Sequence, residues 1–279
     1  MLLQVNHITR YRYDEPVRGV VQSHRLTPTL TDGQKTHTWK ITVTDGVAGG
    51  SFRDGAGDLV HSWSVLGPVS EIAVTVTSTV ETKDMSGVLK GLRETIAPET
   101  YLRETNATRA DAALADLAQS VRMGTGRMGT VRAAGDALGT AHALSAVVSD
   151  AIRYAPGSTS ARTTAAEALA LGTGVCQDHA HAMIAVARCL DMPARYVSGY
   201  LHSNNDGDAH EAAHAWAEVF VPGLGWVGFD PANRCCPDAR YIRLGSGLDA
   251  QDAAPIRGIA RGPGKESLDV TVAIAAMQQ

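Results

Sequence analysis

The stretch Gly172-Thr173-Gly174-Val175-Cys176-Gln177-Asp178-His179 decides the fold, because it sets a cysteine between a glycine-rich turn and a helical pattern. Apolar residues then recur at spacings of three and four: Ala180, Met183, Ile184, Ala187 and Leu190. This period predicts a helix over residues 176–190 with one apolar face. A thiol at a helix N-terminus lies at the positive end of the dipole, which favours the thiolate, and the first backbone N–H groups could hold an oxyanion. By position alone, Cys176 could be a nucleophile or a buried structural cysteine.

A β-hairpin pattern further along the chain carries the next two polar candidates. Two strand-like runs flank Pro222-Gly223-Leu224-Gly225. A three-residue loop there would put Trp216 opposite Asp230 and His214 diagonally on the same face, whereas a two-residue turn would separate His214 from Asp230. Diagonal neighbours lie about 7–8 Å apart, within reach of both side chains. In the first register His214 could take a proton from a thiol while Asp230 orients the ring.

The first 83 residues have the pattern of an antiparallel β domain. Residues 38–44 and 72–80 alternate apolar and polar side chains and are rich in β-branched types, which is typical of half-buried strands. Asp-Gly pairs punctuate the segment, and no helical period is present. We therefore expect a separate N-terminal β domain over residues 1–83.

Residues 84–245 favour a helical layer followed by strands. Helical patterns occupy 112–121, 138–153, a short segment capped by Thr164 and Glu167, and 176–190. Strand patterns occupy 195–201, 214–221 and 226–230, and a C-terminal extension, 246–279, holds one more strand at 267–275 that we expect to pack back on a sheet. Exposed loops are expected at 122–135 and 203–211. This order predicts an α+β fold.

Composition excludes several classes of protein. The 279 residues carry a net charge of −4 without a basic cluster, so a nucleic-acid partner is not expected. The longest apolar run, 272–277, is far shorter than the roughly 20 residues of a membrane helix, and the N-terminus lacks the apolar core of a signal peptide. We expect a cytoplasmic protein with no membrane partner. The four cysteines match neither a disulfide framework nor a zinc ribbon, and we expect no metal and no cofactor.

Four motifs in this order carry a family resemblance: Gly174-Val175-Cys176-Gln177-Asp178, Pro193-Ala194-Arg195-Tyr196-Val197-Ser198-Gly199-Tyr200, His214-Ala215-Trp216 and Asp230-Pro231-Ala232-Asn233. They resemble the bacterial transglutaminase-like family, which is described as candidate cysteine proteases of the papain-like superfamily. Tyr11-Arg12-Tyr13 and Arg25-Leu26-Thr27-Pro28 resemble that family's N-terminal domain. The resemblance implies a papain-like transglutaminase core behind an N-terminal antiparallel β domain.

The resemblance also implies the chemistry. Cys176 would be the nucleophile, His214 the base and Asp230 the orienting acid of a triad that forms a thioester with a peptide or carboxamide substrate. The partner would be a peptide or protein substrate, and either water or an amine would accept the acyl group. Two alternatives stay open: a cysteine peptidase or amidase, and an inactive transglutaminase-like binding or scaffold protein.

Other residues are candidates for lining the site. The Cys176 backbone N–H could hold an oxyanion, with Gln177 or Tyr154 as a second donor, and Trp216 could wall a substrate groove. His179 stands where the family usually has Phe, and we expect it to pack in place of that ring. A metal on His179 and His181 is not expected, because positions two apart on a helix point in different directions.

Overall fold

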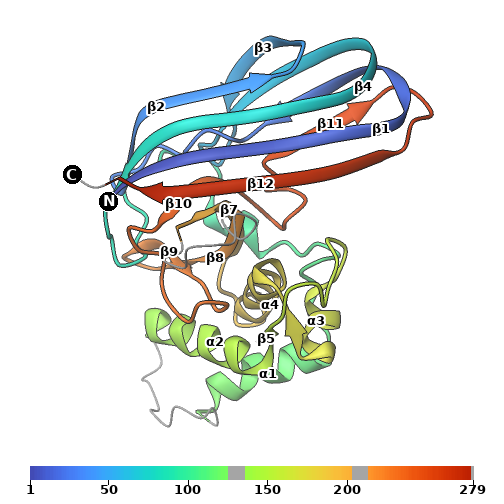
Figure 1. Cartoon of the computed structure of the whole chain (residues 1–279). Helices are drawn as coiled ribbons and strands as arrows, with labels where there is room; N and C mark the ends of the chain where they lie inside the picture. The colour runs from blue at the N-terminus through green and yellow to red at the C-terminus, as the bar shows by residue number, and fades with distance from the viewer. Residues whose placement is uncertain (125–135, 203–212, 278–279) are drawn as a thin grey trace.

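The computed structural model describes residues 1–124, 136–202 and 213–277, so most of the two predicted loops lies outside the described residues. A large twisted six-stranded sheet lies over a second unit of helices and strands (Figure 1). This arrangement confirms the α+β fold class predicted from the sequence. Among the helices that the structure describes, none has the length and apolarity needed to cross a membrane.

The large sheet is antiparallel, with β1 and β4 paired at its centre, β11 and β12 on the other side of β1, and β2 and β3 on the other side of β4. Its six strands are β1 (Leu2–His24), β2 (Gln34–Val43), β3 (Gly46–Arg53), β4 (Leu59–Thr82), β11 (Ile256–Ala260) and β12 (Glu266–Ala276). β1 and β4 alternate buried and exposed residues along most of their length, so one face is buried and the other faces solvent. The buried face packs on Tyr200, Ile242 and Leu244 of the second unit.

The C-terminal strand returns to the N-terminal sheet. β12 pairs antiparallel with β1 from Leu3 opposite Ala276 to Tyr13 opposite Glu266. The two chain ends therefore lie side by side (Figure 1). The predicted strand at 267–275 falls inside β12, and its partner is the first strand of the chain.

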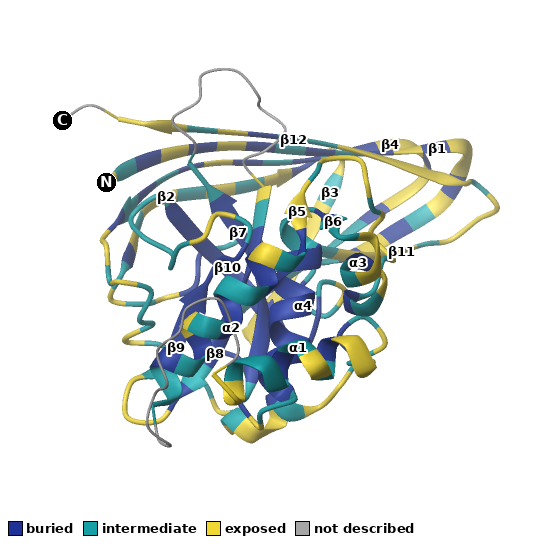
Figure 2. Ribbon diagram, turned by 90° about the horizontal axis from the view of Figure 1, so that it is seen from below, coloured by how far each residue is buried: buried dark blue, intermediate teal, exposed yellow. Residues whose placement is uncertain are grey.

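The second unit, which we call the core, is built on a four-stranded antiparallel sheet in the order β10-β7-β8-β9. Its strands are β7 (Ala194–Leu201), β8 (Ala213–Val221), β9 (Gly225–Phe229) and β10 (Tyr241–Gly247). The other described elements of this unit are η1 (Pro98–Leu102), α1 (Ala112–Arg122), α2 (Ala137–Ala151), β5 (Arg153–Tyr154), α3 (Ala165–Leu171), β6 (Thr173–Gly174) and α4 (Cys176–Arg188). All residues of α4 from Asp178 onward are buried, between the sheet and the other helices (Figure 2).

Local sequence signals set the approach to α4. Thr164 and Glu167 form the predicted capping box at the start of α3, and Gly172 ends that helix at φ 64°, a left-handed conformation that favours glycine. β6 follows at once and pairs in parallel with β5. This pairing also explains why α2 ends at Ala151, two residues before the predicted end. The chain consequently enters α4 in a fixed direction.

A buried network of charged side chains joins the large sheet to the core. Glu218 of β8 accepts hydrogen bonds from Arg195 Nε at 2.6 Å and from Arg243 Nε at 2.8 Å. Arg195 also donates to Glu94, and Arg243 donates to Asp58, which lies just before β4. Arg195 is fully buried, so each charge needs its partner to offset the loss of water. The network fixes the core sheet against the N-terminal sheet.

We expect Glu218→Ala to destabilise the protein by about 3–5 kcal/mol, because it leaves two buried arginines without their shared carboxylate. Urea unfolding followed by circular dichroism measures the change. Glu71→Ala is the matched control, since it removes the carboxylate of an exposed pair with Arg12 and should leave the urea midpoint nearly unchanged. Equal effects of the two substitutions would contradict the structural role of the network.

Candidate active site

Cys176 is the first residue of α4 and is partly exposed. The carboxylate of Asp178 accepts hydrogen bonds from the Val175 N–H at 2.8 Å and from the Thr159 hydroxyl at 2.6 Å. Asp178 is fully buried, and these bonds lock the turn that presents Cys176. The site thus has a cysteine at a rigid helix N-terminus, where the dipole stabilises negative charge.

The β8–β9 hairpin has the register that brings His214 to Asp230. Val221 pairs with Gly225, which leaves a three-residue loop, and Ala217 pairs with Phe229. The next step of this register sets Trp216 opposite Asp230, so His214, two residues before Trp216, lies diagonally across from Asp230. His214 Nε2 donates to Asp230 Oδ2 at 2.6 Å, and both side chains are buried.

Cys176 is in hydrogen-bonding contact with the His214 ring, and Asp230 holds the same ring through Nε2. Burial by itself would lower the pKa of His214. The hydrogen bonds to Asp230 and Cys176, and their charges, outweigh burial and raise this pKa to about 10. The structure therefore brings the three predicted residues into one chain of contacts, with the His214 ring between the sulfur of Cys176 and the carboxylate of Asp230.

Asp230 is held by more donors than the sequence suggested. Asn233 Nδ2 donates to Oδ2 at 2.8 Å, its backbone N–H donates to Oδ1 at 3.2 Å, and the Tyr241 hydroxyl donates to Oδ2 at 2.8 Å. Burial would raise the pKa of Asp230, but the hydrogen bonds from His214, Asn233 and Tyr241 lower it below its usual range. Asn233 was visible in the sequence as part of a motif. Tyr241 carried no such signal, because β10 was not predicted.

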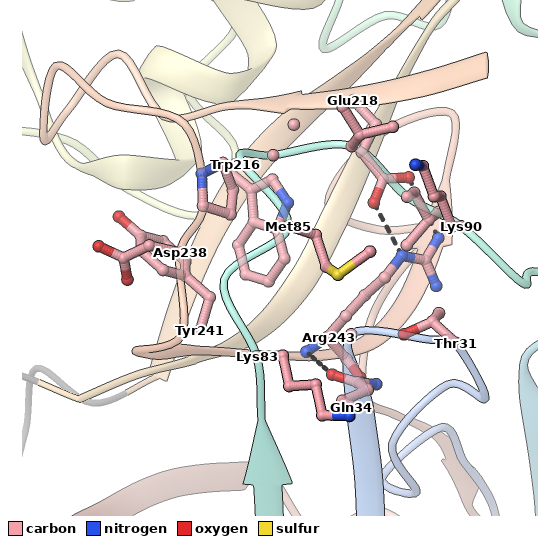
Figure 3. A pocket seen from close by; sticks show the side chains of 16 residues that line it. Thr31, Gln34, Lys83, Met85, Lys90, Trp216, Glu218, Asp238, Tyr241 and Arg243 are labelled. Atoms are coloured by element: carbon pink, nitrogen blue, oxygen red, sulfur yellow. Dashed lines mark hydrogen bonds and ion pairs between the residues drawn. The ribbon is translucent and has the colours of Figure 1, made fainter. Parts of the chain in front are cut away.

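Trp216 contacts the His214 ring and also lines a pocket. Its indole stacks on the His214 ring at 6.4 Å and 26°, and meets the Tyr241 ring edge-on at 5.5 Å. Figure 3 shows the same indole in a pocket that also contains Met85 and Arg243. Trp216 and Tyr241 therefore shield the His214–Asp230 pair on this side, while both form part of the pocket wall.

The remaining predicted site residues lie around the first turn of α4. Gln177 Nε2 donates to the Ala161 carbonyl at 3.3 Å, so its amide is directed to the 155–164 loop. Tyr154 is 42% exposed, and its ring lies 6.3 Å from the ring of His179. His179 is buried, and its two ring nitrogens contact the carbonyls of Val175 and Ile152 at 2.9 and 2.8 Å. These contacts place His179 inside the fold, between the start of α4 and the end of α2.

The other polar candidates have separate surroundings. His181 Nε2 accepts from the Ala250 N–H at 3.0 Å, so His179 and His181 make different contacts. Within the described ranges, no group of three His, Cys, Asp or Glu side chains could hold a metal ion. Burial raises the pKa of the thiols of Cys189, Cys235 and Cys236, which therefore stay protonated at neutral pH.

We expect the His214 ring to remain protonated through neutral pH and to lose its proton near pH 10. Its pKa is raised above the ordinary 6.5, so the imidazolium contributes stability that is fully present below pH 6.5 and is lost as the pH rises through about 10. In Asp230→Asn the pKa of His214 should fall, because burial then opposes the charge and only the contact with Cys176 remains to offset it. A proton NMR titration of the ring measures this, and a wild-type ring that titrates near 6.5 contradicts the account.

Two family patterns match the sequence. The "Bacterial transglutaminase-like N-terminal region" matches residues 3–81, which contain β1 to β4, and the "Transglutaminase-like superfamily" matches residues 127–231. The second match contains Cys176, His214 and Asp230. The two matches therefore cover the large sheet and the unit that holds the candidate site.

Similar proteins extend this likeness over the whole chain. An uncharacterized protein of Mycobacterium leprae (strain TN) is 30% identical over 286 residues, which cover 99% of each chain. The crystal structure of a candidate cysteine protease from Cytophaga hutchinsonii has the same fold, with a TM-score of 0.70 and 21% identity over 100% of this chain and 92% of that chain. A protein-glutamine gamma-glutamyltransferase of Pseudomonas aeruginosa is 34% identical over 97 residues, 33% of this chain and 14% of its own length.

Proposed function

The chain belongs to the bacterial transglutaminase-like family, and we propose that it is an enzyme of thiol acyl chemistry in which Cys176 is the nucleophile. One observation carries the proposal: Cys176 begins a helix and contacts the ring of His214, which in turn donates to Asp230 at 2.6 Å. A nucleophile, a base and an orienting acid in contact are the arrangement that activates a weak nucleophile.

In the proposed reaction, Cys176 Sγ attacks the carbonyl carbon of a carboxamide or peptide bond. The thiol proton is held on His214, and the negative charge of the tetrahedral intermediate lies on the former carbonyl oxygen. When the C–N bond breaks, His214 gives the proton to the leaving nitrogen and a thioester remains on Cys176. Water or an amine then attacks the thioester, and His214 takes a proton from it while the thiolate leaves.

The oxyanion would be stabilised at the N-terminus of α4. The backbone N–H of Cys176 lies in the first turn, where N–H groups have no acceptor within the helix. Tyr154 lies beside the same turn through its contact with His179, and we propose its hydroxyl as the second donor. The Gln177 amide supports this choice indirectly, because it is engaged with Ala161.

The substrate is proposed to be a peptide or protein. A carboxamide acyl donor would fit the gamma-glutamyltransferase of Pseudomonas aeruginosa, and a peptide bond would fit the cysteine protease of Cytophaga hutchinsonii. Both reactions pass through the same thioester and differ only in the leaving amine and the acceptor.

An inactive scaffold protein is the contrasting possibility. Cys176, His214 and Asp230 are all present and in contact, and the pKa of His214 is raised by both partners. A scaffold would require none of these contacts. The intact set therefore favours an enzyme.

We expect Cys176 to react rapidly with iodoacetamide at pH 6, and His214→Ala to lower that rate by at least about 10-fold, because the mutant has no imidazolium to stabilise the thiolate. Mass spectrometry of the peptide that contains Cys176 gives the rate. The raised pKa values of Cys189, Cys235 and Cys236 make these thiols slow internal references in the same digest.

His37→Ala is the matched control for this experiment. His37 also pairs with a carboxylate, Glu81 at 3.1 Å, but the pair is exposed and belongs to the N-terminal sheet. The control should leave the alkylation rate of Cys176 unchanged. If Cys176 reacts no faster than the reference thiols in all three proteins, the enzyme proposal is wrong and the scaffold moves to first place.

We also expect wild-type protein to release ammonia from glutamine-containing peptides, and Cys176→Ala to lose this activity entirely. Addition of a primary amine such as cadaverine should divert the thioester to an amide product that mass spectrometry detects. Release of peptide fragments instead of ammonia would assign the protein to the peptidases. Neither product with wild-type protein would contradict the reaction for this substrate class.

A further inference from the structure

The hydroxyl of Tyr241 ends the chain of contacts that runs from Cys176 through His214 to Asp230. Tyr241 is the first residue of β10 and is 5% exposed. Its hydroxyl donates to Asp230 Oδ2 at 2.8 Å, and Cys235 Sγ lies 3.3 Å from the same oxygen. A buried phenol that touches the acid of the site, but none of the atoms expected to react, has the placement of a supporting group.

The protonation states of Tyr241 and Cys235 decide which group donates in each hydrogen bond. Burial raises the pKa of Tyr241, and the charge of Asp230 raises it further, so the phenol keeps its proton. Burial also raises the pKa of Cys235, so its S–H remains available to donate. With the thiol proton directed to Tyr241 Oη, the single O–H of Tyr241 is free to point to Asp230.

We propose that Tyr241 is a positioning residue that keeps Asp230 ionised and directed at His214. The assignment rests on the proposed function, because it gives Asp230 the role of the orienting acid. Asp230 Oδ2 accepts from three groups, His214 Nε2, Asn233 Nδ2 and Tyr241 Oη. A buried carboxylate stays charged only where such donors replace water, so the loss of one donor makes protonation easier.

Three other titratable groups lie near the hydrogen bond between Tyr241 and Asp230. His214 faces Asp230 from β8, and its ring lies 5.9 Å from the Tyr241 ring. Cys235 faces Tyr241 from the segment before β10. The Arg240 guanidinium lies 6.0 Å from the centre of the Tyr241 ring and is itself paired with Asp238. None of these groups donates a hydrogen bond to Asp230 in place of the tyrosine, other than His214.

Tyr241→Phe tests the assignment, because it removes only the hydroxyl and keeps the ring that packs on Trp216. The rate of iodoacetamide alkylation at Cys176 is measured from pH 3 to pH 8. Protonation of Asp230 weakens the imidazolium and so lowers the rate at acid pH. The acid limb of this profile is the pH range in which the rate falls as the pH is lowered. We expect its midpoint to shift to a higher pH by about one unit, the effect of one hydrogen bond to a charged group.

Tyr200→Phe is the matched control. Tyr200 is 1% exposed on the adjacent strand β7, and its hydroxyl is bonded to His7 Nδ1 at 2.6 Å. The control therefore loses a buried phenolic hydrogen bond that has no contact with Asp230. It should lower thermal stability by an amount similar to Tyr241→Phe while its acid limb stays at the wild-type pH. Equal acid limbs in all three folded proteins would overturn the assignment.

A second readout separates this assignment from the enzyme proposal. A ¹³C NMR titration of the Asp230 carboxyl, assigned by its loss in Asp230→Asn, reports protonation whether or not Cys176 is reactive. We expect the Asp230 pKa to rise by about one unit in Tyr241→Phe and to stay fixed in Tyr200→Phe. An unreactive Cys176 with a shifted carboxyl would defeat the proposed function alone, and an unshifted carboxyl would defeat the role of Tyr241.

Discussion

A slip of one residue in the pairing of β8 with β9 would move His214 and Asp230 to opposite faces of the core sheet. The pairing of Val221 with Gly225 prevents this slip, because it fixes a three-residue loop. Glu218 lies on the same strand face and is bound by two buried arginines, so the same register is also held from the large sheet. The geometry of the site therefore depends on strand register more than on any single contact within it.

Burial and charge act against each other throughout this site. His214 is buried, which opposes its charge, yet its contacts with Asp230 and Cys176 raise its pKa to about 10. The same balance lowers the pKa of Asp230, because burial opposes its negative charge and three hydrogen-bond donors favour it. Trp216 excludes solvent from one side of the pair. A buried pair of charged side chains such as His214 and Asp230 lowers the stability that a purely structural site would have. Nucleophilic catalysis requires such shifted pKa values.

The helix and the hairpin were predictable because their signals are local. The apolar period after Cys176 gave the helix that became α4, and the turn residues 222–225 offered a small choice of registers, one of which is observed. β1 was not predicted, because Asp14-Glu15-Pro16 interrupt its alternation at the position where its pairing with β4 shifts register. β10 was missed for another reason. It contains Gly245 and Gly247, a residue type that is depleted in strands, and its strand character comes from pairing with β7. Tyr241 was missed together with β10, since its role depends on a contact that only the folded sheet creates.

A nucleophilic Cys176 must carry an acyl group with the help of His214. The most direct test is acylation by p-nitrophenyl acetate at pH 7, followed by intact-mass measurement and peptide mapping. We expect one acetyl group on Cys176 of the wild-type protein in a rapid burst, its strong reduction in His214→Ala, and none at this position in Cys176→Ala. Acetylation of Cys176 at the same slow rate in wild type and His214→Ala would show that His214 does not activate the thiol.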